Sequence, residues 1–229
     1  MKPIAIITAR GGSKRIPQKN IKDFLGKPII AYSIETAILS GLFDDVMVST
    51  DSKEIAEIAK KYGASIPFMR SEATSNDFAD TSDVLKEVLE KYKELGRDYT
   101  EFCCIYPTAP FITVKKLKES YKILQNENVY NVVPMVSFSF PPQRGVVLRN
   151  GLTQPIDLVG IEQRSQDLEQ IFHDAGQFYW CKTEEFLKSS NLLYNHTALY
   201  LVSELEVQDI DNQTDWELAE MKYKKMIEN

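Results

Sequence analysis

Cysteine is scarce in this chain of 229 residues, which contains three: Cys103, Cys104 and Cys181. Their spacing fits none of the paired motifs that hold zinc, and an odd number of thiols cannot all pair as disulfides. The composition therefore argues against a disulfide-rich secreted scaffold and against a structural zinc site. We expect the thiols to be reduced and buried in a cytoplasmic protein.

Long apolar runs are also missing. No stretch reaches the roughly 18 consecutive apolar residues that identify a membrane-spanning helix. The residues that follow Met1-Lys2-Pro3 lack the apolar centre of a secretory signal peptide. We therefore expect a soluble protein that is neither inserted into a membrane nor exported.

Positive charge is in deficit, because 27 Lys and Arg against 33 Asp and Glu give a formal net charge of −6. An acidic chain is a poor general binder of nucleic acid. The sequence also contains neither the Walker A motif G-x-x-x-x-G-K-[ST] nor the dinucleotide motif G-x-G-x-x-G. An ATPase of the P-loop type and a dinucleotide-binding oxidoreductase thus lose their main support.

The stretch 4–20 concentrates positive charge within a chain that is acidic as a whole. It starts with an Ile-rich run, typical of a strand buried on both faces, and breaks at Gly11-Gly12, where the backbone can approach an anion closely. Four cations surround these glycines: Arg10, Lys14, Arg15 and Lys19. A cationic, glycine-rich loop after a buried strand predicts a phosphate-binding site. The alternative is a solvated basic loop.

Short apolar runs and amphipathic helical patterns alternate along most of the chain. This alternation, with 43% hydrophobic residues, predicts an α/β fold in which a Rossmann-like, mostly parallel sheet is flanked by helices, as a single domain over residues 1–229. The expected strands are 4–8, 45–50, 65–68, 101–106, 131–136, 177–181, 199–202 and 206–210. The expected helices are 28–40, 53–62, 81–95, 113–124, 183–188 and 214–226.

Residues 137–175 interrupt the alternation. Proline and glycine, at Pro141-Pro142, Gly145 and Gly151 among others, separate short apolar pieces. This pattern predicts a small, β-rich excursion from the sheet.

Asp209 and Asp211 form a spaced acidic pair near the end of the chain. In a strand, residues two apart share a face, and two carboxylates on one face repel unless a cation bridges them. Mg²⁺ commonly takes one or two carboxylates together with phosphate oxygens. The pair therefore indicates a Mg²⁺ site, with exposed aspartates in a turn before the last helix as the alternative.

The string R-G-G-S-K-R-I-P-x-K-N in the basic loop resembles the signature of the sugar-nucleotide cytidylyltransferases, the CMP-sialic acid synthetase (acylneuraminate cytidylyltransferase) family. The resemblance extends to Asp215 and implies the nucleotide-diphospho-sugar transferase type of fold. It also implies a homodimer formed through the excursion, with Mg²⁺ as cofactor. The reaction would transfer CMP from CTP to the anomeric hydroxyl of an acidic nine-carbon sugar and release pyrophosphate, supplying CMP-sugar for surface glycans or flagellin.

The resemblance also assigns roles to residues. Four are implied as catalytic: Arg10, Lys14, Lys19 and Asp211. The residues implied to bind CTP are Ala9, Arg10, Gly11, Gly12, Ser13, Lys14, Lys19, Asn20, Arg70 and Ser82. Those implied to bind the sugar are Tyr106, Arg144, Arg164, Gln166, Gln177 and Tyr179. The metal ligands would be Asp209 and Asp211.

Two departures from the family pattern concern the sugar. Sialic acid synthetases read Q-P-T-S-P-L-R where this chain has Tyr106 in place of the Gln and Ile112 in place of the Arg. The change favours a sugar with a terminal methyl over one with a hydroxylated tail and resembles the pseudaminic acid branch. The alternatives are synthetases for CMP-N-acetylneuraminate, CMP-legionaminate or CMP-3-deoxy-manno-octulosonate, or a non-catalytic nucleotide-binding module.

Overall fold

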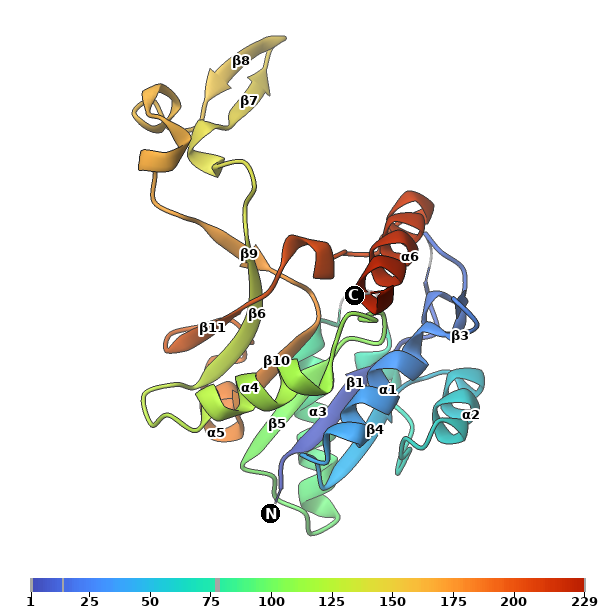
Figure 1. Cartoon of the computed structure of the whole chain (residues 1–229). Coiled ribbons are helices and arrows are strands. Elements are labelled where there is room, and N and C mark those ends of the chain that lie inside the picture. The colour runs from blue at the N-terminus through green and yellow to red at the C-terminus, as the bar shows by residue number, and fades with distance from the viewer. Residues whose placement is uncertain (1, 14, 77–78, 229) are drawn as a thin grey trace.

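The structure is a computed structural model that describes residues 2–13, 15–76 and 79–228. In these residues the main sheet has seven strands in the order β11-β6-β10-β5-β1-β4, with β9 paired to β6 (Figure 1). The strands are β1 (Ile4–Thr8), β4 (Asp45–Ser49), β5 (Glu101–Ile105), β6 (Asn131–Ser137), β9 (Phe172–Asp174), β10 (Phe178–Lys182) and β11 (Thr197–Leu201).

Most strands of this sheet run in the same direction. β1 pairs in parallel with β4 and β5, and β11 pairs in parallel with β6, whereas β10 is antiparallel to both β5 and β6 and β9 is antiparallel to β6. The predicted mostly parallel sheet is confirmed.

Two predicted strands were wrong. The strand predicted at 65–68 is reduced to one parallel bridge between Ser65 and Met47. Residues 206–210, predicted as an edge strand, begin at the last residue of the 3-10 helix Glu204–Glu206 and continue as irregular backbone.

Helices cover both faces of the sheet, and β1 shows why. Ile4 and Ile6 pack into a cluster with residues of α3, while Ala5 and Ile7 point the other way into a cluster with residues of α1, α2 and α4. The helices are α1 (Ile29–Ser40), α2 (Lys53–Lys61), α3 (Thr81–Glu94), α4 (Val114–Leu124), α5 (Thr183–Ser189) and α6 (Gln213–Glu228). Because β1 is apolar on both faces, it lies inside the sheet between β4 and β5.

The carboxyl ends of β1, β4 and β5 lie at the same edge of the sheet. The register pairs Thr8 with Ser49 and Ile7 with Ile105, so the segments that leave these three strands start side by side. In open α/β sheets such an edge is where ligands bind. The basic loop leaves β1 at this position.

The excursion projects away from the body on two extended chain segments (Figure 1). It carries the hairpin of β7 (Val146–Arg149) and β8 (Leu152–Pro155), whose turn residues Asn150 and Gly151 both have positive φ, as an Asn-Gly hairpin turn requires. All residues of both strands are exposed, including Leu148 at 74% and Leu152 at 72%. The excursion also contains three short 3-10 turns, of which Pro142–Arg144 precedes the hairpin and Gly160–Glu162 and Ser165–Asp167 follow it.

Candidate active site

The basic loop is fixed at both ends by hydrogen bonds. Ala9 N–H donates to the Ser49 carbonyl at 2.9 Å, which extends the β1–β4 pairing by one residue. At the far end, Asn20 Nδ2 donates to the Arg10 carbonyl at 2.9 Å and closes the loop. Gly11 N–H donates to Asp51 Oδ1 at 2.8 Å. The loop is thereby held against the segment that follows β4. Lys14, predicted to bind the triphosphate, lies outside the described residues.

Gly11 occupies a position where a side chain would crowd the start of α2. A Cβ built there would lie 3.1 Å from Ser52 Cβ. The glycine therefore permits the close approach of the loop to Asp51 and Ser52.

Asp211 of the acidic pair contacts the basic loop, although the two lie near opposite ends of the sequence. Arg15 Nη2 lies 2.7 Å from Asp211 Oδ1, and Lys19 Nζ lies 3.9 Å from the same oxygen. Lys19 Nζ also donates to the Ile210 carbonyl at 2.6 Å. Cations of the amino-terminal loop and a carboxylate of the carboxyl-terminal segment thus form one cluster.

The predicted geometry of the acidic pair needs one correction, since Asp209 and Asp211 do not lie in a strand. Ile210 between them is buried against Phe24 and Trp216, which leaves the two carboxylates outside the core. Burial raises the pKa of Asp209, and the negative charge of Asp211 raises it further. The two carboxylates therefore lie close enough to repel.

This carboxylate pair fits a hard divalent cation. Among the described residues no group of three or more His, Cys, Asp and Glu side chains forms a ready metal cage. Mg²⁺ needs no such cage when a substrate phosphate supplies the remaining oxygens. Asp209 and Asp211 supply carboxylate oxygens whose mutual repulsion a bound cation would relieve.

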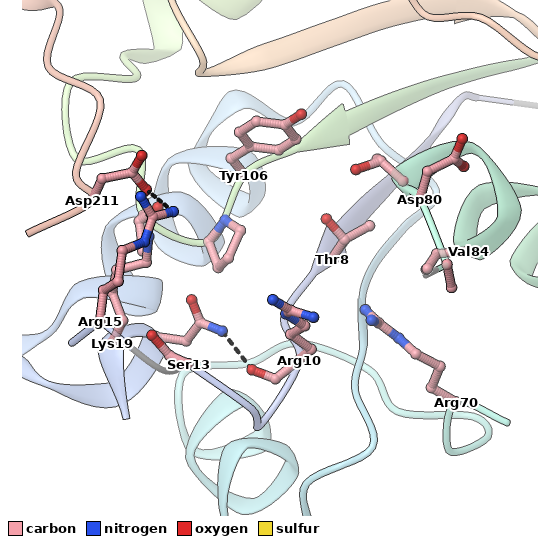
Figure 2. Close-up of a pocket in the computed structure, with 15 residues that line it drawn as sticks. Thr8, Arg10, Ser13, Arg15, Lys19, Arg70, Asp80, Val84, Tyr106 and Asp211 are labelled. Atoms are coloured by element: carbon pink, nitrogen blue, oxygen red, sulfur yellow. Dashed lines mark hydrogen bonds and ion pairs between the residues drawn. The ribbon is translucent and has the colours of Figure 1, made fainter. Parts of the chain in front are cut away.

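A cavity of about 660 Å³ opens at this edge of the sheet, and Figure 2 shows its side chains converging from the basic loop, β5 and α3. It is lined by Thr8, Arg10, Ser13, Arg15, Lys19, Asn20, Arg70, Ala79, Asp80, Thr81, Val84, Tyr106, Pro107, Thr108 and Asp211. Arg10, Arg15 and Lys19 line the side formed by the loop, and Arg70, α3 and Tyr106 line the other side. The cavity could therefore hold a polyanion at one end and a neutral ring system at the other.

Arg70 is held rigidly in the cavity wall. Its Nη2 donates to the Ser49 carbonyl at 2.7 Å and its Nε to Ser49 Oγ at 3.1 Å. Burial lowers the pKa of the guanidinium, and the negative charge of Asp51 opposes that effect. Arg70 thus presents a fixed charge beside Arg10.

The loop after Arg70 is anchored on α3 by Glu87. Its carboxylate accepts from Ser71 N–H and Ser71 Oγ, both at 3.0 Å, from Lys91 Nζ at 2.5 Å and from Thr74 Oγ1. Burial pushes the pKa of Glu87 up, but these hydrogen bonds outweigh it and hold the pKa at about 2. The loop leads to Asp80, which caps α3 with a reciprocal capping box and lines the cavity.

The residues predicted to bind the sugar fall into two groups. Tyr106 lines the cavity, and its ring lies 5.2 Å from that of the buried Tyr179, whose hydroxyl donates to Asp174. Gln177 is buried beside them and donates from Nε2 to the Glu206 carbonyl at 2.6 Å. Ile112, which replaces an arginine of the family pattern, is a core residue.

Arg144, Arg164 and Gln166 lie on the excursion, away from the cavity of their own chain. Arg144 Nη1 donates to Ser165 Oγ at 2.9 Å, and Arg164 Nε lies 2.8 Å from Asp167 Oδ2. All three side chains are on exposed 3-10 turns or next to one. The monomer therefore does not bring them together with Tyr106.

The cavity contains residues to which the sequence analysis gave no specific binding role. Arg15 was counted among the loop cations but given no site role, and its ion pair with Asp211 became visible only in three dimensions. Thr81 lines the cavity, whereas Ser82, predicted to read the base, follows it on α3 outside the lining. Pro107 and Thr108 follow β5 directly, and their position at a strand end had indicated that they would lie in the ligand crevice.

Comparison with known proteins gives a consistent result. Residues 4–225 match the family described as cytidylyltransferase. A pseudaminic acid cytidylyltransferase of Campylobacter jejuni is 41% identical over 98% of this chain and 97% of its own length. A CMP-N,N'-diacetyllegionaminic acid synthase of Legionella pneumophila is 31% identical over 96% of this chain and 95% of its own length.

Among solved structures, a CMP:2-keto-3-deoxy-manno-octonic acid synthetase complexed with CTP superposes with a TM-score of 0.71. The alignment covers 100% of both chains at 18% identity, so it bears on the fold alone. In the described part of this chain no helix is long and apolar enough to cross a bilayer. The family match over residues 4–225 and the similar relatives show that this chain belongs to the cytidylyltransferase family.

Proposed function

We propose that this protein transfers CMP from CTP to pseudaminic acid and releases pyrophosphate. The observation that carries the proposal is the cluster in which Arg10, Arg15 and Lys19 meet Asp211 at the carboxyl end of β1. A triphosphate requires such concentrated positive charge, which the basic loop supplies in a chain that is acidic as a whole. The 41% identity to a pseudaminic acid cytidylyltransferase supports the choice of sugar.

In the proposed reaction the anomeric hydroxyl oxygen of the sugar attacks the α-phosphorus, and the bond from that phosphorus to the bridging oxygen of the β-phosphate breaks. Transfer of this kind depends mostly on positioning and charge neutralisation. Arg10, Lys14 and Lys19 would bind the triphosphate and neutralise the charge that grows on pyrophosphate. Arg15, which shares the loop and the cavity, is added to this group.

Asp209 and Asp211 would hold Mg²⁺, which supplies positive charge to the reacting phosphates when it is bound. In the structure Asp211 is neutralised by Arg15 and Lys19. We infer that these cations turn toward the triphosphate when Asp211 takes up the metal.

The opposite wall of the cavity would hold the cytosine and the sugar. Arg70 and the start of α3, with Thr81 and Ser82, are assigned to the nucleotide. Tyr106 is assigned to the sugar because its ring lines the cavity as a largely apolar wall, and the buried ring of Tyr179, which is outside the lining, packs against it. Such a wall suits a terminal methyl better than a hydroxylated tail, whose buried hydroxyls would lose their hydrogen bonds.

We further propose that the excursion forms a homodimer contact. A second copy is the proposed occupant because the hairpin, far from the core, exposes apolar side chains on both faces: Val146 and Leu148 on one, Val147 and Leu152 on the other. In a dimer with two-fold symmetry the excursion of one protomer can reach the cavity of its partner. Arg144, Arg164 and Gln166 would then bind the sugar carboxylate in the partner's site, because arginine pairs bidentately with carboxylate.

The test is a pyrophosphate-release assay with CTP, Mg²⁺ and pseudaminic acid, in which mass spectrometry identifies the product. We expect CMP-pseudaminic acid and an equimolar amount of pyrophosphate, and no release when the sugar is omitted. Folded protein that releases no pyrophosphate with this acid would overturn the proposal. The Asp211→Asn variant is the matched inactive control.

A further inference from the structure

Lys116 is a charged residue in an unusual place. It lies on α4 with 5% of its surface exposed, at the centre of two contacts. Its Nζ donates to the Phe111 carbonyl at 2.9 Å and lies 3.3 Å from Glu206 Oε1. A buried ammonium is costly unless it is paired and hydrogen-bonded, and here both conditions are met.

The two partners of Lys116 lie next to two different parts of the cavity lining, although neither partner lines the cavity itself. Phe111 ends the segment that leaves β5, in which Tyr106, Pro107 and Thr108 line the cavity. Glu206 precedes the segment that carries Asp209 and Asp211. The Lys116 side chain therefore connects the segment after β5 with the segment around Glu206. The two segments are about a hundred residues apart in the sequence and both lead to the candidate site.

The segment around Glu206 needs such ties because it has no strand partner of its own in the described structure. Gln177 Nε2 donates to the Glu206 carbonyl at 2.6 Å. Lys222 Nζ donates to the Val207 carbonyl at 2.6 Å and to the Glu204 carbonyl at 3.2 Å. The side chains of Gln177 and Lys222 thus replace hydrogen bonds that a sheet would supply, and Lys116 adds an ion pair to the Glu206 carboxylate.

We propose that Lys116 and Glu206 are positioning residues that set where Asp209 and Asp211 lie relative to the loop after β5. The proposal rests on the metal role given above to that acidic pair. An apolar residue at position 116 would fill the same space, but it could not contact the Phe111 carbonyl and the Glu206 carboxylate through polar interactions. The fixed geometry of the buried pair therefore provides specificity of position rather than net stability.

The charge state of Lys116 agrees with this role. Burial lowers the pKa of its ammonium, while the negative charge of Glu206 and the hydrogen bond to it raise the pKa. Loss of the Glu206 carboxylate would remove both the negative charge and the hydrogen bond that favour the protonated form of Lys116. The two residues should therefore act as one unit.

The test compares the variants Lys116→Met, Glu206→Gln and the double variant with Lys118→Met, an exposed lysine on the same helix. The first measurement is hydrogen–deuterium exchange of backbone amides in residues 203–212 without substrate. The second is the Mg²⁺ concentration that gives half-maximal pyrophosphate release, measured with kcat and the KM for CTP.

We expect faster exchange in residues 203–212 for both single variants. We also expect a fall of about 10–100-fold in apparent Mg²⁺ affinity or kcat, the effect usual for residues that orient metal ligands. The KM for CTP should change much less. The double variant should lose little more than either single variant, because residues that act as a unit are not additive. Lys118→Met should match the wild type.

Three results would each overturn the inference: unchanged exchange in 203–212, faster exchange with unchanged Mg²⁺ dependence and kcat, or additive losses in the double variant. A lowered melting temperature alone, with normal kinetics well below it, would show that the pair is merely structural. The Asp211→Asn variant separates the two proposals. If that variant retains wild-type Mg²⁺ dependence, the metal assignment fails, whereas the exchange data still decide whether Lys116 holds the segment.

Discussion

Glu87 offers a sharp test of how the cavity wall is held, because its carboxylate fastens the loop after Arg70 to α3. The change is Glu87→Gln, which keeps the shape but removes the charge that Ser71, Thr74 and Lys91 share. A pKa lowered from 4.5 to about 2 sets an upper limit of about 3.4 kcal/mol of stabilisation, at about 1.4 kcal/mol per tenfold change in proton affinity. Solvent screening reduces this, and we expect a loss of about 2 kcal/mol in the free energy of unfolding at pH 7.

The pH dependence gives this prediction its sign. The pKa of Glu87 is depressed in the folded state, so its stabilisation is complete above the ordinary carboxyl pKa and is lost as the pH falls toward about 2. The difference between wild type and Glu87→Gln should therefore be full at pH 7 and should shrink from about pH 5 downward.

The assay is urea unfolding at pH 7, 5 and 3, followed by tryptophan fluorescence, with Glu90→Gln on the same helix as an exposed control. A difference of about 2 kcal/mol corresponds to a melting temperature lower by about 4–8 °C in a chain of this size. Equal stability of Glu87→Gln and wild type at pH 7, or a difference that does not shrink in acid, would refute the reasoning.

Three further predictions concern the site. Lys19→Ala should cost about 2–4 kcal/mol of transition-state stabilisation in kcat/KM while the circular dichroism spectrum stays that of a folded protein; unchanged activity would contradict the triphosphate role. Asp211→Asn should abolish Mg²⁺-dependent turnover and Asp209→Asn should weaken it, as a Mg²⁺ titration of initial rates will show; wild-type titrations would leave the pair as turn residues. Leu148→Asp should turn a dimer into a monomer in analytical ultracentrifugation. Mixed dimers of Arg164→Ala with Asp211→Asn should regain activity that neither variant has alone, and no gain would exclude sites built from both protomers.

The sequence predicted the sheet well because burial on both faces leaves a plain pattern in β1, where both alternate sets of residues are apolar. The antiparallel direction of β10 left no such mark, since Phe178–Lys182 is buried between β5 and β6 whichever way it runs. The strand predicted at 206–210 failed because its apolar spacing serves another purpose: Ile210 packs under α6, and side chains from elsewhere bind the carbonyls around Glu206.

For the candidate site, local signals identified the loop and the acidic pair but could not show which of their side chains pair. Arg10, Gly11 and Lys19 were visible as one cationic, glycine-containing loop. The ion pair between Arg15 and Asp211 joins opposite ends of the chain and depends on the whole topology. Lys116 stands among surface lysines in the run Lys115–Lys118, and the helical period alone does not show that it is buried against Glu206.

The most direct test of the central claim is competition between pseudaminic acid and N-acetylneuraminic acid for limiting CTP, with the two CMP-sugars separated and quantified. Tyr106 in the cavity and Ile112 in the core leave a hydroxylated tail without two polar partners. At about 1.4 kcal/mol for each unmade hydrogen bond, we predict a preference of at least ~100-fold in kcat/KM for pseudaminic acid. Comparable use of the two acids, or preference for N-acetylneuraminic acid, would contradict the proposed substrate.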